Sequence, residues 1–395
     1  MSLVGFAHGT SHFFHLMLPP LFPWFMQEFG LGFTAVGLLT SVFYAISGIG
    51  QAIAGVWVDR FGAHRVLCAG VSLLTLSGVS VALSTGFNGL LLAALLAGMG
   101  NSVFHPADYA LLNRRVSLPR LGHAFSTHGI CGNLGWALAP LLMTALATAY
   151  SWRVAGLGAA LFGAMALSLL IWKRASLQYP MTAPHPAGGA RPATWSFLRV
   201  RMVWLAFAFF FFLTLGFGAL QNFAPALLHE LYDLSLLSAT SALSIYLLAG
   251  SAGLVLGGFI AKPGRAHEFT VSAVLSGGAL LALLLASKAI PAVLVIPAMA
   301  VMGFTLGIAG PSRDLLVRQA TKARLGEAAF GRVYGMVYSG LDVGLALAPI
   351  AFGLLLDNHL PQWVFVGFAA SLCLAIVAAR AVARDAPTMI EVNRK

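Results

Sequence analysis

Histidines form a stripe along the first apolar stretch of the chain. His8, His12 and His15 are separated by four and three residues, so on a helix they share one face. Imidazole titrates near neutral pH and also binds transition metals. The stripe is therefore interpreted as hydrogen bonding between packed helices, as a substrate or proton site, or as part of a metal site, although one helix rarely supplies every metal ligand. We select His12 and His15 as substrate-binding candidates and expect no resident metal or cofactor.

A second polar stripe lies in another apolar stretch. Asn101, His105 and Asp108 are again spaced by four and three residues, and Pro106 frees a backbone carbonyl beside them. His105 and Asp108 are able to exchange a proton. Alternatively, Asp108 is a charge at a cytoplasmic gate, because Arg114–Arg115 follow within two turns. We take His105 as a substrate-binding candidate and Asp108 as a proton-coupling candidate.

The second half of the chain has ionisable residues of its own. A guanidinium pairs bidentately with a carboxylate or a phosphonate, so Arg313 is the best candidate for binding an anion. Asp314 and Arg318 have the spacing of an intrahelical ion pair, and Arg313 lies about 100° around the helix from Asp314. Tyr338 and Asp342 are spaced by four residues. Asp314 and Asp342 are proton-coupling candidates, and a structural hydrogen bond to a neighbouring helix is the alternative for Asp342.

Other polar side chains inside apolar stretches complete the set of substrate-binding candidates. With Tyr338, they are Tyr44, Gln51, Gln221 and Asn222.

These residues must be positioned by membrane helices. The chain is 59% hydrophobic and 9% charged, whereas soluble domains carry about 25% charged residues. A spanning helix needs roughly 20 apolar residues. The sequence predicts an all-α membrane protein with twelve transmembrane helices in two pseudo-symmetric six-helix bundles, over residues 3–27, 34–57, 66–85, 88–112, 122–148, 152–172, 202–228, 236–261, 269–287, 290–312, 328–355 and 363–382.

The positive charge predicts a topology. The net charge is +11. With the predicted helices in place, the Lys and Arg residues fall on or near one side of the membrane, apart from Arg153 and Lys288. Lys and Arg resist translocation, so that side, with both termini, is predicted to be cytoplasmic. We expect the basic residues to contact lipid head groups and not nucleic acid.

The chain divides into two related halves. Residues 173–200 are rich in proline and glycine and suit a flexible cytoplasmic linker between bundles at 1–172 and 201–395. Gly135–Leu141 parallels Gly344–Ile350, and weaker parallels keep the same order. Internal repeats are typical of transporters whose halves rock about a site at the membrane midplane. The helices at 66–85, 152–172, 269–287 and 363–382 lack ionisable central residues and are expected to face lipid.

The segment between the second and third predicted helices resembles the signature loop of the major facilitator superfamily of secondary transporters. It reads Gly-x3-Asp-Arg-x-Gly-x2-Arg. The resemblance implies twelve helices, alternating access, and an acid that contacts the eleventh helix when the cytoplasmic side is closed. Asp59 is that acid here, and Arg332 is its expected partner. The gating candidates are Gly55, Asp59, Arg60, Gly62, Arg65 and Arg332.

Three further segments resemble the fosmidomycin-resistance branch of this superfamily. They are Gly98–Pro106, Gly132–Gly135 and Ala139–Leu142, and Ser11-His12 fits the branch too. This resemblance implies export of a small phosphonate antibiotic.

Together these features predict a secondary active transporter that exports a small anionic or amphipathic organic compound in exchange for protons. The alternative is proton-coupled uptake of a small organic acid or a metallophore. No GxxxxGK[ST] motif for ATP and no GxSxG motif of a hydrolase occur in the sequence, so we expect no enzyme. The expected partners are the small-molecule substrate, protons and the lipid bilayer. We expect a monomer in a bacterial inner membrane.

Overall fold

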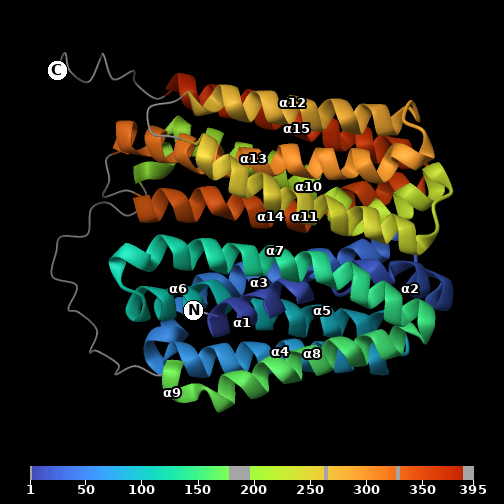
Figure 1. Ribbon diagram of the computed structural model, residues 1–395. Helices are drawn as coiled ribbons and strands as arrows, with labels where there is room; N and C mark the ends of the chain where they lie inside the picture. Colours follow the sequence, from blue (N-terminus) through green and yellow to red (C-terminus); the bar gives the residue numbers. More distant parts are fainter. Residues whose placement is uncertain (1, 178–195, 262–265, 326–329, 386–395) are drawn as a thin grey trace. The chain divides into compact units, whose positions relative to one another are not determined.

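A computed structural model describes residues 2–177, 196–261, 266–325 and 330–385 (Figure 1). All regular elements in these ranges are helices. The first part contains α1 (Ser2–His15), η1 (Pro19–Leu21), α2 (Phe22–Phe29), α3 (Phe33–Phe61), α4 (Ala63–Leu83), α5 (Phe87–Asn101), α6 (Phe104–Arg115), α7 (Leu118–Ala149), α8 (Trp152–Trp172) and α9 (Arg174–Leu177). The second part contains η2 (Ser196–Arg199), α10 (Arg201–Tyr232), α11 (Leu236–Ile260), α12 (His267–Ala286), α13 (Ala292–Leu325), α14 (Phe330–Asp357) and α15 (Pro361–Asp385).

The all-α membrane fold is confirmed. Among the described residues, 11 helical stretches are long and apolar enough to cross a membrane, and α1, η1 and α2 together form the first predicted span. Large apolar side chains on these helices remain uncovered by protein. Leu161 and Phe259 are each 73% exposed and Val293 is 80% exposed. Lipid tails cover such surfaces in a multi-pass membrane protein.

The first span is not the single helix predicted for residues 3–27. Helix α1 ends at His15, and the chain turns before η1 and α2 continue. Pro19 and Pro20 cause this break, because neither has an N–H to donate to the carbonyl four residues earlier. The prediction overlooked these prolines. As a result, the histidine stripe occupies a short helix, and His15 is the last residue of that helix.

The fourth span is also interrupted. Helix α5 ends at Asn101 and α6 starts at Phe104, where the sequence predicted one helix over residues 88–112. Pro106 cannot donate a hydrogen bond to the carbonyl of Ser102, which accounts for the break at that point. Asn101 and Asp108 therefore do not share one continuous helical face.

The predicted signature loop is mostly helical. Helix α3 continues to Phe61, and only Gly62 separates it from α4. The φ angle of Gly62 is 85°, a conformation that favours glycine. Asp59 and Arg60 thus lie on the last turn of α3 and not in a loop.

The chain forms two compact units. One comprises Met1–Ala187 with Gln221–His229 and Asp233–Ser244, and the other Gly188–Leu220 with Glu230–Tyr232 and Ile245–Lys395. The predicted domain boundaries at residues 172 and 201 stay a prediction, and most of the predicted linker lies outside the described residues.

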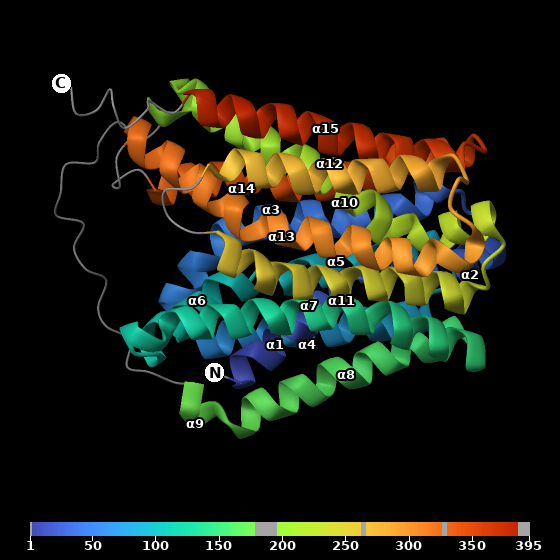
Figure 2. The ribbon, with the colours of Figure 1, turned by 45° about the horizontal axis from the view of Figure 1, so that its top comes forward.

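Corresponding helices pair in the same way in each unit. Helix α4 packs on α8, and α12 packs on α15 (Figures 1 and 2). A Cβ atom on Gly135 of α7 would overlap the carbonyl oxygen of Gly9 of α1. In the other unit, a Cβ on Gly344 of α14 would lie 2.6 Å from the carbonyl oxygen of Phe211 of α10. The glycines that begin the sequence repeat therefore each allow a close helix contact.

Candidate functional site

Helix α1 approaches α7 at backbone distance. Gly5 and Gly9 are one turn apart on α1, and both face Cys131 of α7. A Cβ atom on Gly9 would lie 2.8 Å from the carbonyl oxygen of Cys131. Small residues at this spacing are typical of tightly packed membrane helices. The contact holds the histidine stripe of α1 beside α7.

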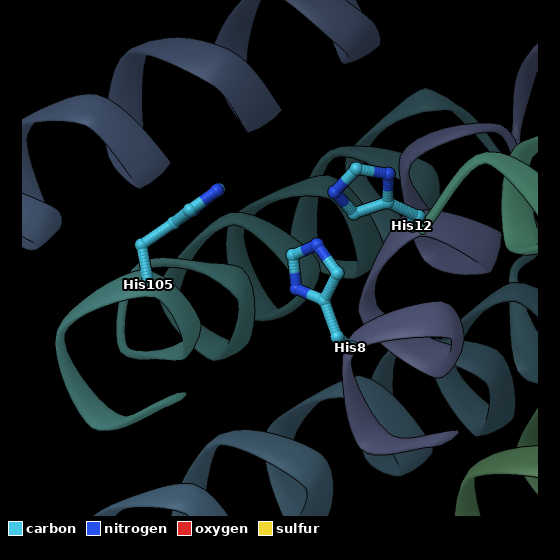
Figure 3. Close-up of side chains that lie close together, drawn as sticks. All are labelled: His8, His12 and His105. Atoms are coloured by element: carbon cyan, nitrogen blue, oxygen red, sulfur yellow. The ribbon is translucent and has the colours of Figure 1, made fainter. Parts of the chain in front are cut away.

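Histidines from α1, α6 and α7 gather into one cluster. The ring centroids of His8 and His12 are 4.3 Å apart, and those of His12 and His15 are 4.7 Å apart. His128 stacks on His8 at 3.5 Å, and His105 meets the ring of His8 edge-on at 5.3 Å. Figure 3 shows His8 and His12 of α1 with His105 opposite them. We call His8, His12, His105, His128 and Asp108 the histidine cluster.

Asp108 is fully buried within the histidine cluster. Its Oδ2 lies 2.9 Å from Nε2 of His128 and 3.2 Å from Nδ1 of His8. Its Oδ1 has no hydrogen-bond partner among the described residues. The spacing along the sequence indicated His105 as the partner of Asp108, whereas His128 was not among the predicted site residues. An ionisable residue inside an apolar span is itself a functional signal, so His128 could have been found.

His15 belongs to a neighbouring network centred on Asn101. The Asn101 Oδ1 accepts a hydrogen bond from Ser11 and lies 2.8 Å from Nε2 of His15, and its Nδ2 donates to Ser47 at 2.7 Å. Tyr44 packs against His15 with ring centroids 5.6 Å apart. The network joins α1, α3 and α5. It gives Nε2 of His15 a hydrogen-bond partner outside the histidine cluster.

His12 is buried without hydrogen bonds. Neither ring nitrogen has a partner in the described part of the chain, and the side chain is packed against His8, His15 and Trp136. An unpaired buried polar group costs about 1–3 kcal/mol. This cost is relieved if a bound group pairs with the imidazole.

Two sets of three side chains have the spacing of metal ligands. In each set the ligand atoms all lie within 4.8 Å of one another. The first set is His8, His12 and His105, and the second is His8, Asp108 and His128. His8 belongs to both sets.

The second unit has a smaller polar site. Nε of Arg313 donates to Oδ1 of Asp314 at 2.9 Å, and the Tyr338 hydroxyl donates to the same oxygen at 3.3 Å. The guanidinium also lies 4.8 Å from the ring centroid of Phe210. Asp342 lies one turn from Tyr338 and is half-buried, with no hydrogen bond or ion pair to any described residue. Sequence candidates from α13 and α14 thus lie together.

The remaining candidates are dispersed. Gln221 and Asn222 are buried on α10, and the carboxamide of Gln221 has no hydrogen-bond partner among the described residues. Gln51 is half-buried one turn beyond Ser47 on α3. Gly55, Arg60 and Arg65 are exposed, and the side chains of Asp59 and Arg332 lie outside the described part, so the gate stays a prediction.

Sequence analysis also overlooked a polar contact between α2 and α8. Nη2 of Arg153 lies 2.7 Å from Oε1 of Glu28, and the indole N–H of Trp152 donates to Oε2. The Arg153 guanidinium, followed by the Trp152 indole, holds the pKa of Glu28 below its ordinary value. The guanidinium also stacks on the Trp152 ring at 4.0 Å. This contact ties one end of α2 to α8.

Membrane-length helices with polar and ionisable side chains between them define a multi-pass membrane protein. A family model described as the Major Facilitator Superfamily matches residues 2–331. The chain therefore belongs to this superfamily, as its sequence resemblance predicted. Members of this family are transporters and not enzymes.

The chain is similar to known members over different lengths. It is 29% identical to the Fosmidomycin resistance protein of Escherichia coli (strain K12) over 274 residues, which cover 68% of this chain and 66% of that relative, just under two thirds. It is 24% identical over 367 residues to the Uncharacterized MFS-type transporter YfnC of Bacillus subtilis (strain 168), covering 90% of this chain and 86% of that protein.

The fold is shared with a solved transporter. A crystal structure of a bacterial homologue of the human lysosomal transporter Spinster, in an inward-facing and occupied conformation, matches with a TM-score of 0.76. The match covers 99% of this chain and 97% of that chain at 13% sequence identity. At this identity the likeness shows the fold alone.

Proposed function

We propose that this transporter exports a small anionic or amphipathic organic compound in exchange for protons. The observation that carries the proposal is the polar site of the second unit. It combines a half-buried guanidinium, Arg313, with a half-buried carboxyl group, Asp342, inside membrane-spanning helices. Ionisable groups on membrane-spanning helices are costly and mark substrate and ion pathways.

Arg313 has the chemistry to bind the anion. Its Nε is occupied by Asp314, and Phe210 covers one face of the guanidinium. These contacts fix the plane of the group and leave its terminal N–H donors to face a carboxylate or phosphonate bidentately. Phe210 adds an apolar surface that suits an amphipathic compound.

Asp342 has the properties of a proton carrier. A charged carboxylate without a partner is unfavourable when water is excluded from its span, whereas the neutral acid is tolerated. Closure of the transporter around this group therefore favours the protonated form, and reopening to water favours release. Asp342 shares a face of α14 with Tyr338, which contacts Asp314, so the proton and anion sites adjoin.

The export direction rests on likeness. Similarity to a Fosmidomycin resistance protein supports export, and the bacterial origin of such relatives supports a bacterial inner-membrane location. The cation distribution supports cytoplasmic termini. Proton-coupled uptake of a small organic acid is the second candidate. The Arg313–Asp314 pair favours it, because protonation of Asp314 would release Arg313 for an incoming anion.

Inside-out membrane vesicles that contain the full-length protein test the proposal, because their lumen corresponds to the outside of the cell. The lumen is acidified, fosmidomycin and a panel of small phosphonates and carboxylates are added outside, and both accumulation and lumenal pH are recorded. We expect one compound to accumulate while the lumen becomes more alkaline. Accumulation driven by an alkaline lumen would instead indicate uptake in the cell, and movement without proton flux would overturn proton coupling.

Variants locate the two roles. Asp342→Asn should abolish proton-driven accumulation, and Arg313→Gln should raise KM for the anion. Asp233→Asn is the matched control, because Asp233 is an exposed loop acid between α10 and α11. Its φ of 55° suits asparagine equally well. Retained coupling in Asp342→Asn would remove Asp342 from the mechanism.

A further inference from the structure

We propose that His8, His12 and His105 bind one divalent transition-metal ion, such as Zn²⁺, within the first unit. The site is independent of the direction and the coupling proposed above. It would select Zn²⁺, Co²⁺, Ni²⁺ or Cu²⁺ over Mg²⁺ and Ca²⁺, because imidazole nitrogen suits the former group and oxygen ligands suit the latter.

The ligand set comes from two helices. His8 and His12 are one turn apart on α1, and His105 projects from α6 across from them (Figure 3). Their ligand atoms lie within 4.8 Å of one another. Zn–N bonds of about 2.0–2.1 Å place the nitrogens of a tetrahedral site roughly 3.3 Å apart, so the rings must close by about 1.5 Å at most.

The rings of His8 and His12 pack closely against a glycine of α7. A Cβ atom on Gly132 of α7 would lie 2.8 Å from Nδ1 of His12 and 3.0 Å from Nε2 of His8. These two nitrogens therefore face the same point above the α7 backbone. Both nitrogens of His12 are buried and lack a hydrogen-bond partner among the described residues, so either one is available to a bound ion.

Asp108 lies behind His8. Its Oδ2 is 3.2 Å from Nδ1 of His8, which makes no hydrogen bond within the described part of the chain, and a carboxylate on that side of the ring leaves Nε2 for the metal. Carboxylates behind metal-bound imidazoles are a common feature of zinc sites, since they fix the ring and raise its basicity. Three protein ligands leave one tetrahedral position open. Water or a donor group of a chelating compound would fill that position, which links the site to the metallophore alternative.

The second ligand set competes with this assignment. His8, Asp108 and His128 also have suitable spacing, but that arrangement makes Asp108 a ligand and leaves both nitrogens of His12 unpaired. The first set instead uses His12 as a ligand, so we assign the metal to it.

Equilibrium binding to the purified full-length protein tests the site. The protein is prepared without a histidine tag, stripped with chelator and titrated with Co²⁺, whose visible absorption reports tetrahedral coordination, and Zn²⁺ then competes. We expect one equivalent to bind. His12→Gln and His105→Gln should each weaken binding by more than 100-fold, and Asp108→Asn by about 10–100-fold.

A matched control and a variant-free measurement accompany the titration. His64→Gln should bind normally, because His64 lies 3.1 Å from a backbone oxygen of α8 and is outside both sets. X-ray absorption of the Zn²⁺-loaded wild-type protein should show three imidazole nitrogens, whether or not the variants fold. Absence of Co²⁺ binding to the folded protein would overturn the proposal. A carboxylate bound directly to the metal would also overturn it, as would loss of binding in His128→Gln while His12→Gln and His105→Gln still bind. None of these readouts requires transport, so they are separable from failure of the proposed export.

Discussion

The contact between α1 and α7 predicts that Gly9→Ala separates the two helices. The new Cβ would lie 2.8 Å from the carbonyl oxygen of Cys131, whereas ordinary van der Waals contact begins at 3.4 Å. The helices must therefore move apart by about 0.6 Å, the difference between these values, because a backbone oxygen cannot rotate away. Overpacking of this kind costs about 1–3 kcal/mol.

The higher helix propensity of alanine stabilises the variant and offsets part of the steric cost, so a control variant must account for this gain. Alanine is favoured over glycine by about 1 kcal/mol inside a helix. Gly129→Ala on α7 carries the same gain, but its Cβ meets nothing within 4 Å. The difference between the two variants therefore isolates the steric term, which we expect to be about 1–3 kcal/mol.

Thermal unfolding in detergent at a fixed scan rate, followed by tryptophan fluorescence, measures the effect. Gly9→Ala should unfold at a lower temperature than Gly129→Ala. Gly5→Ala provides an internal test, because its Cβ would lie 2.9 Å from the Sγ of Cys131, and Cys131→Ala should remove that clash but not the Gly9 clash. Equal unfolding temperatures for Gly9→Ala and Gly129→Ala would refute the close packing of α1 on α7.

Two further predictions concern stability elsewhere. The pKa of Glu28 is held below its ordinary value by Arg153, so the pair stabilises the fold above the unfolded glutamate pKa of about 4.3 and stops doing so as pH falls through the lower folded pKa. The Glu28 side chain is 38% exposed, so solvent screens the ion pair, and Glu28→Gln should lower the free energy of unfolding by about 0.2–1 kcal/mol at pH 7. In acid, the unfolding temperatures of the variant and the wild type should converge. A difference that persists in acid would contradict the ion pair. Gly340→Ala would place a Cβ 2.6 Å from the Phe207 carbonyl oxygen and should lower the unfolding temperature relative to Gly277→Ala, which meets open space; indistinguishable variants would argue against this contact.

The spans could be predicted because long apolar stretches need no knowledge of their neighbours. The interruptions were only partly predictable. Pro106 was recognised as a perturbing residue, whereas Pro19 and Pro20 were absorbed into an apolar stretch that reads as continuous. Proline removes one hydrogen bond but lowers the mean hydropathy of a long window only slightly, so spans located by hydropathy conceal such breaks.

The site was predicted in part for a similar reason. Spacing along α1 placed His8 and His12 on one face, but a periodic pattern does not say which helix that face meets. His128 contacts Asp108 across 20 residues of sequence, and Arg153 contacts Glu28 across 125. Such pairs are fixed by helix packing, which a single sequence does not encode in its local spacing.

The position of Cys131 gives the protein a native chemical reporter. Its thiol sits where Gly5 and Gly9 press α1 against α7, and it is half-buried there. Any step of the transport cycle that parts these helices would open a path for a maleimide to this sulfur. With Cys68 and Cys373 replaced by serine, the rate of alkylation would time the motion of α1 in the absence of any attached fluorophore.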